Sequence, residues 1–255
     1  MPDGHSAGGG QAHAAGASSS PVDADPYVGR RLGDVRGTMS SAARSLNGCR
    51  FLVRMVAEGG AAAARQVLEE VAGEIVRLMV DSVAHKLVEK LVEHLADDQI
   101  TRVLHILAAS PGQIVTFITV VVTSSFFFHH VCRDRHGCNV LNSFIDKTAG
   151  DRQPWNSLIV AVCRDALALA EHGYSNYVVQ QVIRSVPEAR DCLHTTFRGQ
   201  YVSLSRQAAS SHVVQRCLEL FCSEHVDEII RELLGCHRWG CRFPQLISDP
   251  YANYK

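Results

Sequence analysis

Histidine and cysteine side chains gather between residues 129 and 138, where they could bind a metal ion. The imidazole and thiolate groups that zinc prefers are supplied there by His129, His130, Cys132, His136 and Cys138. Their spacing matches no familiar zinc finger and includes no paired CxxC. Solvated histidines and buried thiols are therefore favoured over a metal site. The same interpretation applies to a second cluster, formed by Cys236, His237 and Cys241.

Enzyme motifs are the next possible source of chemistry. The sequence has no nucleophile elbow, no phosphate-binding glycine loop and no HExxH helix. Its acidic pairs, Glu69 with Glu70 and Asp97 with Asp98, are explained as exposed helix charges and helix caps. We therefore expect no enzyme, no cofactor and no bound metal.

The composition indicates a protein that folds without disulfides. Its 255 residues are 46% hydrophobic, which is enough for a sizeable core. The 25 basic and 26 acidic residues give a net charge of −1, so no long-range field recruits nucleic acid. Nine cysteines, an odd number with no secretory signal before them, indicate reduced thiols. These features predict a cytoplasmic protein.

Two stretches stand outside any regular pattern. Residues 1–36 begin with a run rich in Gly, Ala and Ser and are predicted to be disordered. Residues 103–128 carry no Lys, Arg, Asp or Glu. Their continuous apolar part is about 15 residues long, shorter than the roughly 20 that cross a bilayer. A buried helix or an aggregation-prone segment is therefore favoured over a membrane span.

A ten-residue pattern recurs five times along the chain. The segments are NGCRFLVRMV (47–56), VAHKLVEKLV (83–92), HGCNVLNSFI (136–145), YSNYVVQQVI (174–183) and ASSHVVQRCL (209–218). In each segment the second residue is small, and the fifth, sixth, ninth and tenth are apolar. This spacing places the apolar residues on one face of a helix and leaves the third, fourth and seventh residues on another. Each segment is therefore predicted to be an amphipathic helix.

The spacing of the segments predicts the architecture. Measured between the small residues, the intervals are 36, 53, 38 and 35, with 42 to a sixth start in YANYK at 251–255. Further helical patterns lie between the segments, and no alternating strand pattern competes with them. We predict an all-α protein over residues 37–255, a curved α-solenoid of about five three-helix units and a C-terminal stub. The interval of 53 predicts an irregular or deleted unit near residues 108–130.

These segments resemble the repeats of the Pumilio (PUF) homology domain. The similarity lies in LMVDSVAHKLVEKL, RHGCNVL, SNYVVQQVI, SSHVVQRCLELF and ELL followed by SDPYANY. It implies that the second helix of each three-helix repeat lines a concave surface, where two or three side chains recognise one RNA base. Residues i and i+4 contact the base edge together, and residue i+1 stacks on a base.

The resemblance assigns RNA-binding roles to the third, fourth and seventh residues of each segment. Asn176 and Gln180 would recognise uracil, with Tyr177 stacking, and Ser211, His212 and Gln215 resemble an adenine-recognising set. The family usually carries Glu in place of Gln215 and recognises guanine there. Weaker or unassigned base preference is expected for the sets Cys138, Asn139 and Asn142; Cys49, Arg50 and Val53; and His85, Lys86 and Glu89.

The leading hypothesis is a monomeric, sequence-selective binder of single-stranded RNA in mRNA 3′ untranslated regions. Through recruited corepressors it would regulate translation and mRNA stability, as the resemblance implies. A helical scaffold that has lost RNA recognition and binds a protein is the main alternative, favoured by Val53 and the set His85, Lys86 and Glu89. A truncated or aberrantly spliced product is the third. The first hypothesis requires the sets on residues 174–183 and 209–218 to share one inner groove.

Overall fold

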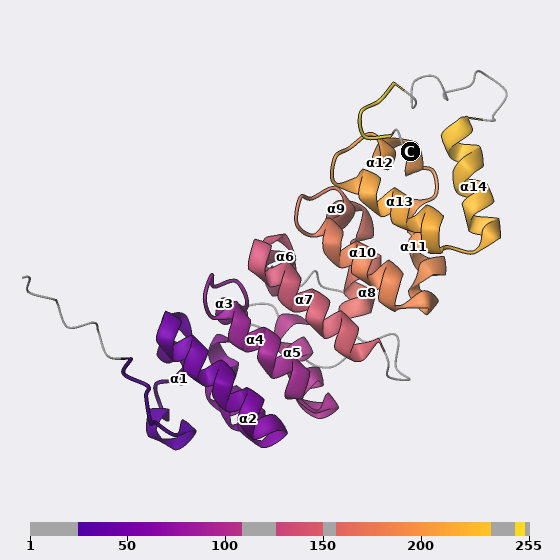
Figure 1. Cartoon of the computed structure of the whole chain (residues 1–255). Helices are drawn as coiled ribbons and strands as arrows, with labels where there is room; N and C mark the ends of the chain where they lie inside the picture. The colour runs from indigo at the N-terminus through magenta and orange to yellow at the C-terminus, as the bar shows by residue number, and fades with distance from the viewer. Residues whose placement is uncertain (1–24, 109–125, 150–156, 236–247, 253–255) are drawn as a thin grey trace, which may run out of the picture.

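A computed structural model describes residues 25–108, 126–149, 157–235 and 248–252, and the regular elements in these ranges are all helical. Five inner helices each carry one of the ten-residue segments: α2 (Leu46–Val71), α4 (His85–His94), α7 (Arg135–Thr148), α10 (Asn176–Ser185) and α13 (Ser210–Leu220). Each inner helix packs against the next along the row, as Figure 1 shows. The predicted α-solenoid is confirmed.

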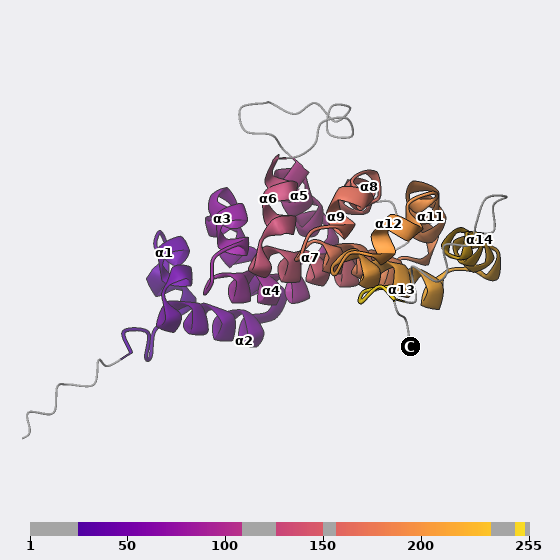
Figure 2. The same ribbon diagram turned by 90° about the horizontal axis from the view of Figure 1, so that it is seen from above.

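Two further sets of helices complete the units. Short helices precede the inner ones: α1 (Met39–Arg44), α3 (Ile75–Met79), α6 (Phe126–Arg133), α9 (Ala166–Ala170) and α12 (Tyr201–Ser205). Outer helices follow them: α5 (Asp97–Ala108), α8 (Ser157–Arg164), α11 (Arg190–Phe197) and α14 (Ser223–Leu234). Three 3-10 turns lie at Leu32–Val35, Ala72–Glu74 and Pro187–Ala189. Seen from above, the stack is arched, with α2, α4, α7 and α13 along the concave side (Figure 2).

The apolar stripe of the segments forms the core between units. Of the 20 residues at the fifth, sixth, ninth and tenth positions, all but Met55 and Leu218 are buried. These two lie on α2 and α13, the inner helices at the ends of the row, which have one inner neighbour each. Burying one such side chain contributes about 1.5–3 kcal/mol. The repeated stripe therefore holds neighbouring units together.

The small residue at the second position allows the inner helix to approach the preceding helix. A Cβ on Gly48 or Gly137 would lie 2.3 Å from the carbonyl oxygen of the residue six positions earlier. At the same place in later units, the Ser175 and Ser210 hydroxyls donate to Leu169 O at 2.8 Å and Leu204 O at 2.7 Å. In four units, therefore, the backbone carbonyl six residues before the small residue fixes where the inner helix begins.

A carboxylate three residues before the small position caps several of these helix starts. Asp81 Oδ1 accepts from the amides of Val83 and Ala84, and Asp134 Oδ1 accepts from those of His136 and Gly137. The Ser45 hydroxyl takes this role in the first unit by accepting from the Gly48 amide. The stub repeats the arrangement, because Asp249 Oδ1 accepts from the Tyr251 and Ala252 amides and Ala252 is buried. Residues 248–252 therefore keep the register of the repeat.

The structure corrects the predicted start of the folded region. Residues 25–36 belong to the segment predicted to be disordered, yet Leu32 and Val35 are buried in the core. The Tyr27 ring also stacks on Phe51, with centroids 5.2 Å apart. The bias toward Gly, Ala and Ser is confined to the first twenty residues and does not reach this short apolar stretch. Residues 1–24 lie outside the described part.

The long interval between the second and third segments does not separate their helices. α4 packs directly against α7, so no whole unit stands between them. The predicted irregularity falls mainly on residues 109–125, which lie outside the described residues, as does most of the charge-free run. Among the described helices, none is long and apolar enough to cross a membrane.

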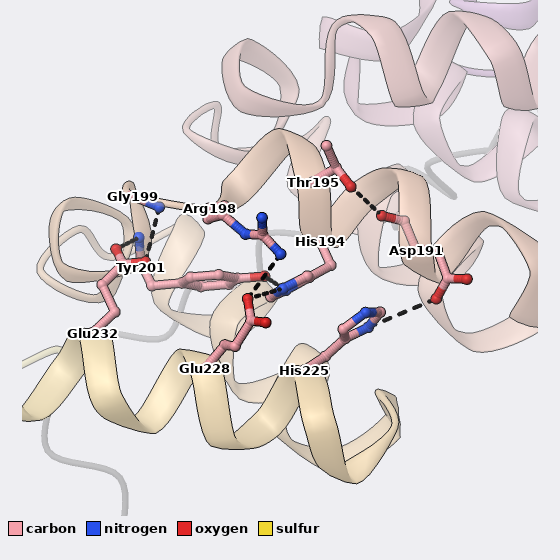
Figure 3. A network of polar contacts seen from close by, with 9 residues as sticks. All are labelled: Asp191, His194, Thr195, Arg198, Gly199, Tyr201, His225, Glu228 and Glu232. Atoms are coloured by element: carbon pink, nitrogen blue, oxygen red, sulfur yellow. Dashed lines mark hydrogen bonds and ion pairs between the residues drawn. The ribbon is translucent and has the colours of Figure 1, made fainter.

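A polar network joins α11, α12 and α14 at the C-terminal end of the stack (Figure 3). The buried His194 ring bonds through Nδ1 to the Tyr201 hydroxyl at 2.9 Å and through Nε2 to Glu228 at 3.1 Å. Arg198 also pairs with Glu228, at 2.8 Å, and the His225 ring stacks on His194. The hydrogen bond from His194, followed by the charge of Arg198, lowers the pKa of Glu228. Further groups around the pair are Glu232, which accepts from the Gly199 and Tyr201 amides, and Asp191, 3.7 Å from His225.

Substituting Gly137 tests the close approach at the second position. The variant Gly137→Ala should lower the free energy of unfolding by about 1–3 kcal/mol, because its Cβ meets a backbone carbonyl that cannot move aside. Urea denaturation measures this difference. Gly73→Ala is the matched control, since a Cβ there meets nothing within 4 Å. Equal stability of the two variants would contradict the role of the small residue.

The network around Glu228 predicts an acid-side dependence of stability. A carboxyl whose folded pKa lies below its ordinary value of 4.5 stabilises the fold above that value, and the stabilisation is lost as the pH falls through the folded pKa. Glu228→Gln should therefore lower the melting temperature at pH 7, and its difference from the wild type should shrink toward pH 3.

The control for this measurement is Asp227→Asn, which removes a neighbouring carboxylate on α14. Asp227 is exposed and has no partner among the described residues. Thermal melts of the three proteins between pH 3 and pH 7 give the comparison. A difference between Glu228→Gln and wild type that stays constant over this range would refute the role of the carboxylate.

Candidate nucleic-acid interface

The fourth residues of the five segments form an exposed row across the inner helices. All five side chains are solvent-exposed, and they are Arg50, Lys86, Asn139, Tyr177 and His212. Because α2, α4, α7, α10 and α13 pack in sequence, these residues succeed one another along the row. With 53% of its surface exposed, Tyr177 presents an aromatic ring that no neighbouring unit covers. The row can therefore stack on planar groups of a ligand that lies along the inner helices.

The third residues of the segments are less exposed than the fourth. Almost fully buried, they are Cys49, His85, Cys138, Asn176 and Ser211. Each belongs to the first turns of its helix, and all but Cys49 bond to a carbonyl of the preceding turn. The three Asn176, Tyr177 and Gln180 side chains therefore do not share equal access to the surface.

Asn176 and Gln180 form a defined pair on α10. Asn176 Nδ2 donates to His172 O and Gly173 O, both at 2.9 Å, so both its N–H groups are occupied. Its Oδ1 accepts from Gln180 Nε2 at 2.9 Å. Gln180 retains its Oε1 and one N–H, and neither has a partner among the described residues. The half-buried Gln180 is thus the group that can bond a base edge, and Asn176 orients it.

The set on α13 has the same layout with a different partner. His212 and Gln215 are exposed, and Ser211 is buried, with its hydroxyl 3.3 Å from Ala208 O. Gln215 Nε2 donates to Glu219 at 3.0 Å, and Glu219 also pairs with Arg216. α10 packs against α13, so the fourth and seventh residues of these two segments lie on neighbouring inner helices.

The set on α7 has little free hydrogen-bonding capacity. Burial raises the pKa of the Cys138 thiol, which donates to Arg135 O at 3.2 Å. Asn139 is exposed, whereas Asn142 is half-buried and its Oδ1 is buried with no hydrogen-bond partner. A carbonyl oxygen that no solvent or ligand reaches cannot distinguish bases. Asn139 is therefore the accessible group of this unit.

In the second unit, the polar groups of the set on α4 have partners within the same unit. His85 is buried, its Nδ1 lies 2.8 Å from Asp81 O, and its ring packs 4.2 Å from that of His136. Lys86 pairs with Glu89 at 3.0 Å. Both charges of this set are therefore partnered within α4.

In the first unit, Cys49 donates to Val83 O of the next unit at 3.3 Å, and burial raises the pKa of its thiol. Arg50 is exposed and Val53 offers no polar group. This set therefore presents one cation and no group that can bond a base edge.

The histidines and cysteines considered as zinc ligands have other surroundings. His129 pairs with Asp165 at 3.0 Å, Cys132 is fully buried, and His136 lies against His85. Within the described ranges, no three His, Cys, Asp or Glu residues are grouped as a metal site. Cys236, His237 and Cys241 lie outside those ranges.

Sequence reasoning missed the caps and the ring pair that position this face. Asp81, Asp134 and Asp249 each stand three residues before the small position, which was a readable signal. The contact of His85 with His136 had no such signal, because it joins the third position of one unit to the first of the next.

A row of stacked three-helix units with exposed polar residues along its inner helices defines an α-solenoid repeat protein. The family model for the Pumilio-family RNA binding repeat matches residues 74–108, 127–153, 165–192 and 200–234, which are units two to five. The chain belongs to this Pumilio family. The first unit, not matched by the model, packs on the second in the same way as the others.

Similar proteins of known sequence and structure agree with this membership. Putative pumilio homolog 7, chloroplastic, from Arabidopsis thaliana is 28% identical over 87% of this chain and 42% of its own length. Pumilio homolog 12 of the same plant is 25% identical over 90% and 48%. The chain thus spans about half the length of such relatives.

Solved structures of Puf domains have the same fold. The Puf4 RNA binding domain bound to an HO endonuclease RNA 3′ UTR recognition sequence superposes with a TM-score of 0.71 at 22% identity, over 88% of this chain and 61% of that one. PUF-8 in complex with PBE-RNA gives 0.73 at 20% identity, over the same shares. At these identities the likeness concerns the fold.

Burial of the third-position cysteines predicts low thiol reactivity. Cys49 and Cys138 are buried, and burial raises the pKa of both thiols and so lowers their thiolate fraction, whereas Cys222 is exposed. Brief alkylation of the native protein with iodoacetamide, mapped by mass spectrometry, should label Cys222 and spare the other two. After unfolding in urea all three should react. Equal native labelling would show that the third position is accessible.

Proposed function

We propose that this chain binds single-stranded RNA, with sequence selectivity, along the fourth and seventh positions of its inner helices. The observation that carries the proposal is the pair of neighbouring helices α10 and α13. They present Tyr177 with Gln180 and His212 with Gln215 at equivalent positions. Aromatic rings stack on bases, and an amide bonds one base edge through donor and acceptor. Membership of the Pumilio family supports this ligand.

The proposed order of importance among the sets follows from their free groups. Gln180 would recognise uracil with Asn176 orienting it, and Gln215, beside Ser211, would favour adenine. Asn139 would add stacking area on α7, whereas His85, Lys86 and Glu89 add little because their polar groups already have partners. Stacking or edge contacts contribute about 1–3 kcal/mol per base. With two complete sets we expect micromolar affinity.

The wider function is proposed on the same basis. The relatives Puf4 and Puf3 were solved with RNA 3′ UTR recognition sequences. We propose that this chain binds mRNA 3′ untranslated regions in the cytoplasm as a monomer and, with protein corepressors, regulates translation and mRNA stability. Some of the Arabidopsis relatives are named chloroplastic, so cell fractionation is the matching test of location.

A protein-binding scaffold is the second candidate, and it is favoured by the set on α4, whose polar groups already have partners. With Lys86 and Glu89 paired and His85 buried, this unit offers no base-specific group to RNA. A scaffold would bind its partner with or without Tyr177 and Gln180 and would show no preference within an RNA pool.

Substitutions in the fourth unit test the RNA proposal. Fluorescence anisotropy with a randomised pool of short single-stranded RNA, followed by selection of bound sequences, measures affinity and preference. Tyr177→Ala should weaken binding of all sequences about tenfold or more, because the stacking ring is removed. Gln180→Ala should relax the preference at one nucleotide position.

Tyr174→Ala is the matched control, because Tyr174 is an exposed tyrosine that lies outside the row. It should leave both affinity and preference unchanged. If the wild type binds no pool member better than the variant lacking both Tyr177 and Gln180 side chains, the scaffold interpretation replaces this one.

A further inference from the structure

Two arginines on the first inner helix differ from the other cations of the row. Arg50 and Arg54 occupy the fourth and eighth positions of the first segment, one helical turn apart on α2. Both are exposed, and neither guanidinium has an ion-pair or hydrogen-bond partner among the described residues. Arg54 lies over the ring of Phe51, 5.9 Å from its centroid, which directs the side chain along the helix surface.

The equivalent cations of other units are neutralised by an acid three residues later. Lys86 pairs with Glu89, Lys90 with Glu93, and Arg216 with Glu219. In the first unit, the residues three positions after Arg50 and Arg54 are Val53 and Ala57. Neither can accept a hydrogen bond from a guanidinium. The first unit therefore carries two cationic groups on its inner face, with apolar residues where the second and fifth units have acids.

An apolar residue at the seventh position also leaves this unit without a side chain that recognises a base. Val53 occupies the seventh position, where the fourth and fifth units carry Gln180 and Gln215. Cys49, at the third position, is buried and donates its thiol to Val83 O. What remains at the surface is two planar guanidinium groups, whose paired N–H donors match the oxygens of a phosphate.

We propose that the first unit binds the phosphodiester backbone of the RNA through Arg50 and Arg54 in place of a base. This inference rests on the proposed function, since α2 continues the row of inner helices along which the RNA lies. The site supplies affinity that is independent of sequence, while α10 and α13 supply selectivity. It also explains how a chain with a net charge of −1 attracts a polyanion, because the positive charge is local.

The dependence of affinity on salt tests this site. For single strands, each phosphate that a cation neutralises adds about 0.7 to the slope of log affinity against log salt. Binding of a fluorescein-labelled RNA pool of about ten nucleotides is measured by anisotropy at several KCl concentrations. The double variant Arg50→Ala with Arg54→Ala should reduce the slope by about 0.7 for each phosphate that is no longer neutralised. Its affinity at low salt should fall about tenfold, equally for all sequences.

Two further variants separate charge from folding. Arg65→Ala removes an exposed arginine from α2 beyond its kink at Gly60, so it should leave slope and affinity unchanged. Ala57→Glu restores the acid found in the second and fifth units and should reduce the slope while both arginines remain. Circular dichroism melts establish that each variant is folded.

The outcomes distinguish this inference from the proposed function. If the wild type binds the RNA pool but the double arginine variant keeps the wild-type slope, the phosphate site is wrong and base recognition stands. If Arg65→Ala lowers the slope as much, the effect is one of net charge and the site is equally refuted. If the wild type binds no RNA but captures acidic peptides through Arg50 and Arg54, the proposed function fails instead.

Discussion

The packing of each inner helix against the next is the constraint on which the rest of this structure depends. It requires a pair of apolar residues on each of two successive turns and a small residue at the start, where the chain meets a backbone carbonyl of the preceding helix. Because this demand repeats in every unit, the side chains between the apolar positions are also repeated in space. The exposed row therefore results from the repeated packing of the core.

Within this frame the units are chemically unequal. The fourth and fifth have aromatic or imidazole rings beside amides that keep free hydrogen-bonding groups. The second has a cation and an acid that form an ion pair, and the first has two arginines that form no ion pair among the described residues. Under the proposed function, a single scaffold would divide the tasks of selecting a sequence and holding a charged backbone among its units.

Much of the fold could be predicted from the sequence, because the apolar pattern and its spacing determine helix faces and the order of stacking. The site was less predictable. The pattern identified Tyr177 and His212 as outward-facing, but it could not show that Asn176 donates both N–H groups to its own preceding turn. That depends on backbone carbonyls whose positions follow from the connection between helices. The ordered stretch at residues 25–36 was missed because its two core residues, Leu32 and Val35, are too few to form a period.

The direct contact of α4 with α7 has a consequence for how such a protein can change. α4 and α7 are neighbours in the stack although residues 95–134 lie between them in the sequence. A connection of different length between α5 and α6 would change the length of the chain while α4 and α7 remain neighbours. The length of a linear ligand that the row of inner helices can contact is consequently determined by the number of stacked units and not by the length of the chain.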